Sequence, residues 1–244
     1  MIRSSLLATR RGLGHAHSTR DDGPVGNLGL PGAPAARAAL VAAAGGEPLS
    51  LCVPEQVHGV RVAVAGRPGE TFPATDALVT ATRGVPLLVQ GADCPLVALH
   101  DEAALVSAVA HCGWRGTAAR IGSATVAAMR DLGAAPDRIA AAVFPGIGPC
   151  CFEVGLDVVG AFASAFGMRS AAWFAPAANR SKRMLDVRAA IVADLADAGI
   201  ARERVDVVPG CTSCARHGGA AFYSHRASRG APERHGLAAV LRGA

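Results

Sequence analysis

Short apolar runs alternate with longer helix-forming stretches along this chain, and this alternation limits its possible folds more than any other feature. Residues 85–90 and 105–110 are two such runs, each followed by a break at Gly, Cys or His. Apolar runs of this length that end at turn residues indicate buried strands. We therefore expect strands at these two positions and at residues 138–144 and 205–208. We expect a further strand at residues 51–53, followed by a turn.

Alanine-rich and amphipathic stretches separate these runs. The residue types favour helices at 33–44, at 118–132 with Thr117 as the capping residue, at 156–166 and at 184–198. No linker divides the chain, and 51% apolar content is ample for one core. The pattern predicts a single interleaved α/β domain over residues 1–244.

Three potential metal ligands stand where expected strands end. His58 follows the first turn, Cys94 follows the strand at 85–90, and His111 follows the strand at 105–110. Strand ends can converge on one rim of a sheet. Two His and one Cys form a known catalytic zinc set, which leaves one coordination position for water or substrate. These residues are the candidate metal ligands and catalytic residues, with copper as an alternative metal.

A second cysteine pair competes with this set. Cys211 and Cys214 have Cys-x-x-Cys spacing and His217 follows them, which is typical of a metal half-site. The sequence alone shows no second half-site to complete it. We therefore expect Cys214 to be incidental and Cys211 to belong to a strand end.

Eight motifs in order give the chain a specific resemblance. They are residues 9–12 (Thr-Arg-Arg-Gly), 27–29 (Asn-Leu-Gly), 56–59 (Gln-Val-His-Gly), 76–80 (Asp-Ala-Leu-Val-Thr), 92–95 (Ala-Asp-Cys-Pro), 111–116 (His-Cys-Gly-Trp-Arg-Gly), 148–155 (Gly-Pro-Cys-Cys-Phe-Glu-Val-Gly) and 222–226 (Phe-Tyr-Ser-His-Arg). Together they span nearly the whole chain. The chain thus resembles the YfiH-type family, also called peptidoglycan editing factor and formerly the multicopper polyphenol oxidoreductase or laccase-domain family.

The resemblance implies a fold, an activity and a set of site residues. The implied fold is a mixed-sheet α/β/β/α layered sandwich, similar to the catalytic domain of cytotoxic necrotizing factor toxins. The implied activity is zinc-dependent phosphorolysis of adenosine, inosine, guanosine and 5′-methylthioadenosine, with adenosine deamination beside it. The family's zinc ligands fall on His58, Cys94 and His111. Its substrates imply a nucleoside and phosphate as the small-molecule partners.

Five further residues are candidate substrate contacts: Arg10, Asn27, Arg115, Glu153 and Arg226. Arg115 and Arg226 have forked donors suited to phosphate, although Arg115 could equally pair with surface carboxylates. Glu153 could shuttle a proton or bind a ribose hydroxyl, or else stabilise the N-terminus of the helix that follows. Asn27 could be a turn residue instead.

Two motifs have a simpler expected role. His15 and His17 have the spacing of half a copper motif, but one pair cannot build the several copper centres of a laccase, so we expect two solvated loop histidines. Asp93 adjoins Cys94, and it could orient an imidazole from behind or pair with an arginine.

Three other functions remain open at the sequence level. Without a metal, Cys94 activated by His58 or His111 would give a thiol hydrolase. With a metal, the same residues could serve a hydrolase that edits peptidoglycan precursors. A copper-dependent polyphenol oxidase is the third.

Charge and cysteine content limit the partners and the cellular location that we expect for the protein. The net charge is +5, but Lys182 is the one lysine and aromatic content is 4%, so we expect no nucleic-acid partner. No apolar stretch is long enough for a membrane span or signal peptide, and 7 cysteines without an export signal favour reduced thiols. A cytoplasmic protein is expected, and its oligomeric state is left open.

Overall fold

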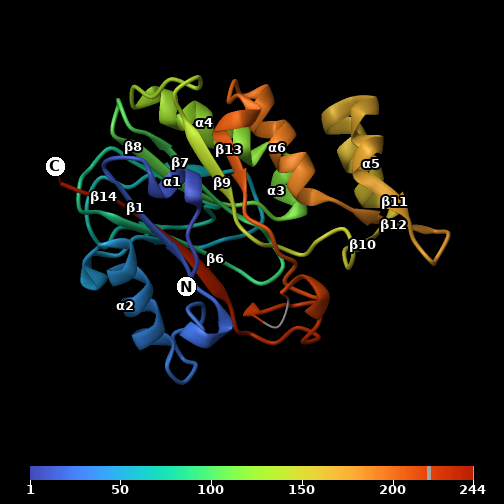
Figure 1. The fold of residues 1–244 in the computed structure, drawn as a ribbon, viewed down its shortest axis with the longest axis horizontal. Coiled ribbons are helices and arrows are strands. Elements are labelled where there is room, and N and C mark those ends of the chain that lie inside the picture. The colour runs from blue at the N-terminus through green and yellow to red at the C-terminus, as the bar shows by residue number, and fades with distance from the viewer. Residues whose placement is uncertain (219–220, 244) are drawn as a thin grey trace.

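Two sheets that differ in size form the centre of the molecule (Figure 1). The computed structural model describes residues 1–218 and 221–243. The strands are β1 (Leu13–His17), β2 (Val53–Pro54), β3 (Val62–Val64), β4 (Thr71–Phe72), β5 (Ala77–Thr80), β6 (Pro86–Gly91), β7 (Leu96–Asp101), β8 (Val106–His111), β9 (Ala140–Val143), β10 (Glu153–Gly155), β11 (Phe174–Pro176), β12 (Lys182–Leu185), β13 (Val205–Val207) and β14 (His235–Leu241). The helices are α1 (Ser5–Ala8), α2 (Ala33–Ala44), α3 (Trp114–Ala118), α4 (Ile121–Asp131), α5 (Leu156–Phe166) and α6 (Val187–Asp197).

The larger sheet has six strands in the order β13-β9-β7-β8-β5-β3 and contains both parallel and antiparallel pairs. The smaller central sheet has the order β1-β14-β6 and is antiparallel. A short sheet, β10-β12-β11, lies beside α5 at one end of the molecule (Figure 1). Strands β2 and β4 form a separate pair. The chain is therefore a mixed α/β protein, as the alternation of apolar runs predicted.

Alternate side chains of the central strands feed different apolar clusters. In β6, Leu87 and Val89 pack with residues of the larger sheet, whereas Leu88 faces the opposite way and packs with α2. A third cluster joins the other face of the larger sheet to α4, α5 and α6. Because side chains alternate with a period of two, a strand buried on both faces reads as a continuous apolar run. This explains why the runs at 85–90 and 105–110 showed no alternation in sequence.

The predicted helix at 118–132 is confirmed from Ile121 to Asp131 as α4, but its predicted start and cap are wrong. Thr117 lies buried inside α3 rather than capping a helix, and Gly113 precedes that helix as its N-cap. Arg120 has a left-handed backbone with φ of 72° and separates α3 from α4. Its guanidinium bonds Asp197 and the carbonyl oxygen of Ala165, so tertiary contacts stabilise the break.

The predicted helix at 184–198 is also corrected, because β12 occupies its first residues. Asp186 then caps α6 by accepting a hydrogen bond from the amide of Ala189 at 3.1 Å. A capping carboxylate fixes the start of a helix. The helix at 156–166 is confirmed with the same bounds as α5. Within the described residues, no helix combines the length and the apolar character needed to cross a bilayer.

His15 and His17 are not solvated loop residues, which corrects that expectation. Both lie in β1, with 2% and 0% of their surface exposed. The ring of His17 stacks on Phe144 at 5.1 Å and lies 4.9 Å from the ring of His235. The sequence did not indicate this strand, because two of its five residues are histidines.

Candidate metal centre

The side chains of His58, Cys94 and His111, which we call the His/Cys triad, meet at one point of the structure. Each offers one ligand atom, and these atoms all lie within 4.8 Å of one another. The two imidazole rings stand edge to face with centroids 4.8 Å apart. Three residues that are distant in sequence thus converge closely enough to share one ion.

Strand register explains why two members of the triad meet. Strands β7 and β8 are antiparallel, and Leu96 at the start of β7 pairs with His111 at the end of β8. Cys94 stands two residues before Leu96, so the same pairing brings it beside His111. A backbone hydrogen bond from Cys112 to Pro95 extends the pairing at 2.9 Å.

Asp76 holds the two histidines in place, and sequence reasoning gave it no role. It is fully buried just before β5, and its Oδ1 accepts a hydrogen bond from Nδ1 of His111 at 2.9 Å. The same carboxylate accepts hydrogen bonds from the amides of Val57, His58 and Gly59 at 3.2, 3.0 and 2.7 Å. These three bonds stabilise the turn in which His58 has a positive φ of 62°. The signal that could have found Asp76 is its place at the head of the motif at residues 76–80.

The arrangement of donors fits a metal ion. Because Asp76 occupies Nδ1 of His111, the other ring nitrogen is free for a metal, which is the usual arrangement for a metal-bound histidine. Gly113 leaves the space that a metal site needs, since an added Cβ would lie 3.0 Å from Sγ of Cys94 and 3.0 Å from the ring of His58. Within the described residues this group contains three donors, so a four-coordinate ion would keep one position open.

Protonation in the absence of a metal also favours cation binding. Burial alone would raise the pKa of Cys94, but hydrogen bonds with His111 and His58 lower it to about 6. Burial would lower the pKa of His111, but hydrogen bonds with Asp76 and Cys94 raise it to about 9. The metal-free site is therefore a thiolate beside an imidazolium, and a cation would replace the imidazolium proton.

A cavity of about 550 Å³ opens over the triad. Pockets that bind small ligands have volumes of this order. Its lining combines the triad with two aromatic residues, three arginines, several polar side chains and several small or apolar residues: Trp114, Phe152, Arg115, Arg226, Arg234, Asn27, Gln56, Gln90, Asp93, His225, Gly26, Gly91, Ala92, Ile147 and Pro232. The positive groups suit an anion and the aromatic rings suit a flat ring system.

The predicted substrate residues divide into two groups. Asn27, Arg115 and Arg226 line the cavity. Arg10 and Glu153 are not among the lining residues, and the carboxylate of Glu153 bonds Nζ of Lys182 at 3.0 Å. Because Glu153 lies in β10, it does not act on the first turn of α5, where Asp157 is the acidic residue.

Asp93 orients neither imidazole of the triad. Its Oδ1 accepts a hydrogen bond from Oγ1 of Thr212 at 2.6 Å, and its Oδ2 accepts one from the backbone amide of Arg226 at 2.7 Å. It thus fixes two loops against the cavity. The guanidinium of Arg226 lies 5.8 Å from the ring centroid of Phe152, and that of Arg115 lies 4.5 Å from the ring of Trp114. Sequence reasoning gave no role to the two aromatic residues or to Gln56, although all three stand in the quoted motifs, and it gave none to Gln90 and Arg234.

Comparison with known proteins places these features in a family. A family model described as multi-copper polyphenol oxidoreductase laccase matches residues 33–241. A protein named purine nucleoside phosphorylase from Deinococcus radiodurans is 50% identical over 53% of this chain and 50% of its own length. Adenosine deaminase RL5, from an unknown prokaryotic organism, is 39% identical over 67% of this chain and 66% of its own length. The matched stretches thus span half to two thirds of these relatives.

A solved structure gives the same result for nearly the whole chain. The crystal structure of YlmD from Geobacillus stearothermophilus superposes with a TM-score of 0.84 at 26% identity, covering 96% of this chain and 93% of that one. The fold is therefore YfiH-like. Since the matching family model extends over most of the sequence and includes the whole triad, this chain belongs to the multi-copper polyphenol oxidoreductase laccase family, the YfiH-type family that its motifs predicted.

Proposed function

We propose that this protein is a zinc-dependent purine nucleoside phosphorylase that also deaminates adenosine, with His58, Cys94 and His111 as the metal ligands. The observation that carries the proposal is the three-donor triad on the wall of a cavity rimmed by arginines. The names of the relatives from Deinococcus radiodurans and of RL5 support the same two activities.

The donor set favours zinc over the copper centres of a laccase. Two imidazole nitrogens and one thiolate form a known catalytic zinc set. His15 and His17 are buried in β1 and stack against aromatic rings, so they do not extend the triad into a multinuclear copper site. A single copper ion in the triad is the alternative that metal analysis would detect.

The residues of the cavity have separate roles in phosphorolysis. When bound, zinc supplies a Lewis acid that polarises a substrate oxygen. A phosphate oxygen bonds to C1′ of the ribose as the bond to the purine breaks, and the departing purine takes up a proton. Arg226 and Arg115 neutralise phosphate and orient it, while Phe152 and Trp114 pack against the flat purine. Asn27 contributes a polar contact to the nucleoside.

The same open coordination position supports deamination, which replaces the amino group at C6 of adenosine by oxygen from water. The metal-free alternative uses the Cys94 thiolate as a nucleophile beside His111, and the lowered thiol pKa of about 6 favours it when no metal is bound. The two accounts predict opposite effects of a chelator.

Product analysis with two variants tests the proposal. Incubation of the zinc-loaded protein with adenosine and phosphate should release adenine and ribose 1-phosphate, and adenosine alone should give inosine and ammonia. Cys94→Ala should lose the zinc bound at the triad together with the turnover, whereas Cys52→Ala, at a buried cysteine outside the triad, should keep both. Full activity after removal of zinc would favour the thiol hydrolase, and cleavage of a peptidoglycan precursor without adenosine turnover would favour the editing hydrolase.

We also propose that residues 1–244 form a single catalytic domain with an α/β/β/α layering like that of the cytotoxic necrotizing factor toxins. The three apolar clusters support the layering, because one packs α2 on the smaller sheet, one joins the two sheets, and one packs α4 and α6 on the larger sheet.

A further inference from the structure

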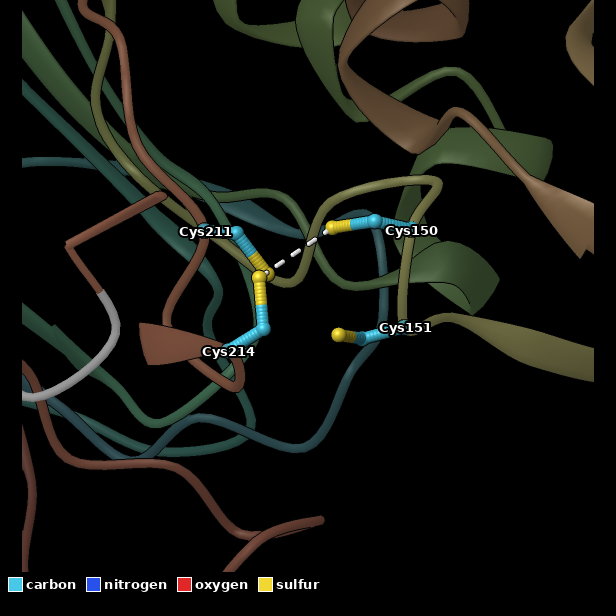
Figure 2. Close-up of side chains that lie close together, drawn as sticks. All are labelled: Cys150, Cys151, Cys211 and Cys214. Atoms are coloured by element: carbon cyan, nitrogen blue, oxygen red, sulfur yellow. Dashed lines mark hydrogen bonds between the residues drawn. The ribbon is translucent and has the colours of Figure 1, made fainter. Parts of the chain in front are cut away.

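A second group of potential metal ligands lies outside the triad. Cys150, Cys151, Cys211 and Cys214, which we call the four-cysteine cluster, direct their sulfur atoms toward a common centre (Figure 2). All four sulfurs lie within 4.8 Å of one another, and those of Cys150 and Cys214 are 3.5 Å apart. The sequence showed only the half-site at residues 211–214, and the fold supplies the missing half.

Sheet topology explains the convergence of these two cysteine pairs. Strands β9 and β13 are parallel neighbours, and their last residues, Val143 and Val207, lie opposite each other. The chain segments that leave these strands therefore start from the same edge of the sheet. One segment carries Cys150 and Cys151, and the other carries Cys211 and Cys214. The two cysteine pairs are therefore neighbours in space although they are far apart in sequence.

The spacing of the sulfurs suits a tetrahedral metal. Four thiolates at about 2.3 Å from a zinc ion stand roughly 3.8 Å from one another. The one separation given by a direct contact, 3.5 Å between the sulfurs of Cys150 and Cys214, is close to this value, and the 4.8 Å that contains all four sulfurs leaves room for it. A disulfide requires two sulfurs about 2.0 Å apart and would leave the other two without a role.

Backbone groups around the four-cysteine cluster are arranged as they are around bound thiolates. The amides of Gly148 and Ser213 donate hydrogen bonds to Sγ of Cys211 at 3.2 and 3.5 Å. Such bonds stabilise negative charge on sulfur. Gly148 also provides space, since an added Cβ would lie 3.3 Å from Sγ of Cys150 and 3.2 Å from Cβ of Cys211. His217 contributes a contact of 3.1 Å between Nδ1 and Sγ of Cys214.

We propose that Cys150, Cys151, Cys211 and Cys214 bind a second zinc ion, in a closed structural site with four thiolate ligands. Four protein ligands leave no position for substrate, so this ion has a structural role. Tetrahedral sets of four sulfurs are typical of zinc and of iron–sulfur centres. All four sulfurs lie within 4.8 Å of one another, which suits a single ion rather than a cluster of several irons.

The four-cysteine cluster joins two loops that form the cavity wall. Phe152, which lines the cavity, directly follows Cys151 in the first loop. In the second loop, Thr212 directly follows Cys211, and its hydroxyl donates a hydrogen bond to the carboxylate of Asp93. The same carboxylate accepts a hydrogen bond from the backbone amide of Arg226. A metal in the cluster would therefore fix both loops relative to the substrate.

Metal counting in variants that lack the triad ligand separates this proposal from the proposed function. The Cys94→Ala protein should still hold one zinc per chain, and Cys94→Ala combined with Cys150→Ser and Cys214→Ser should hold none. Cys52→Ser is the matched control, because Cys52 is buried and belongs to neither site. Combined with Cys94→Ala, it should retain the one zinc.

Cobalt substitution provides a second readout that does not depend on activity. Cobalt bound in the Cys94→Ala protein should show thiolate-to-metal charge-transfer absorption, and Cys151→Ser should weaken or abolish it. Equal zinc content with and without Cys150 and Cys214 would overturn the proposal. So would iron in place of zinc, or a reductant-sensitive mass difference of two hydrogens that reports a disulfide.

Discussion

Replacement of Asp76 by asparagine should weaken metal binding at the triad while the fold is retained. The carboxylate accepts four hydrogen bonds, two at each oxygen: His58 N and His111 Nδ1 at Oδ1, and the amides of Val57 and Gly59 at Oδ2. An asparagine side chain keeps one acceptor and places an N–H₂ group at the other position. In either orientation the asparagine therefore loses two of the four hydrogen bonds. Its NH₂ group, itself a donor, then stands opposite the two N–H donors that have lost their acceptor.

The magnitude follows from the partners that are lost. Hydrogen bonds to a charged group each contribute about 1.5–3 kcal/mol, so the loss of two of them in Asp76→Asn should lower the free energy of unfolding by roughly 3–6 kcal/mol. A change in the group behind a metal ligand weakens metal affinity about 10- to 100-fold. One orientation releases Nδ1 of His111 and the amide of His58, and the other releases the amides of Val57 and Gly59 on either side of His58, so both outcomes disturb a ligand.

Competition with a chromophoric zinc chelator measures this affinity directly. The matched control is Asp101→Asn, because Asp101 is also fully buried and accepts bonds from the amides of Ala103, Ala104 and Ala135, far from the triad in the sheet. Asp101→Asn should lower stability to a similar degree and leave zinc affinity unchanged. Equal zinc affinity of the two variants would refute the role assigned to Asp76.

Three further perturbations test other parts of the account. Gly113→Ala has an allowed φ of −61°, but its Cβ would come within 3.0 Å of the triad sulfur, so zinc affinity should fall at least about 10-fold; Gly66→Ala, with open space around its Cβ, should leave it unchanged in the same titration. Arg226→Gln should raise the KM for phosphate about 10- to 100-fold with zinc content unchanged, because a charge-assisted contact is lost. Burial lowers the pKa of His235 to about 3 and that of His17 well below 6.5. Because the unfolded chain binds these protons first, stability should be complete above pH 6.5 and fall below it by about 1.4 kcal/mol per pH unit for each histidine; urea unfolding at several pH values should show a shallower slope for His235→Phe.

The elements and the triad could be predicted because their signals are local. Apolar runs that end at Gly or Pro marked the strands, and the ligands Cys94 and His111 stood at the ends of two of them. The pairing of β7 with β8 then brings those ends together. The eight motifs predicted the family. Such features depend on a few neighbouring residues, so one sequence suffices to read them.

The remaining features depend on partners that are distant in sequence. The break at Arg120 is stabilised by Asp197 on α6, and no local signal announces a left-handed arginine. His17 reads as polar, yet it stacks on Phe144 in the core. Cys150 and Cys211 are brought together only by the parallel pairing of β9 and β13.

Anomalous X-ray scattering at the zinc absorption edge tests the central claim most directly. We expect a peak about 2.3 Å from Sγ of Cys94 and about 2.0–2.1 Å from one ring nitrogen each of His58 and His111, with its fourth position facing the cavity. A zinc-loaded crystal with no peak among these three side chains, or with a fourth protein side chain bound to the ion, would contradict the account.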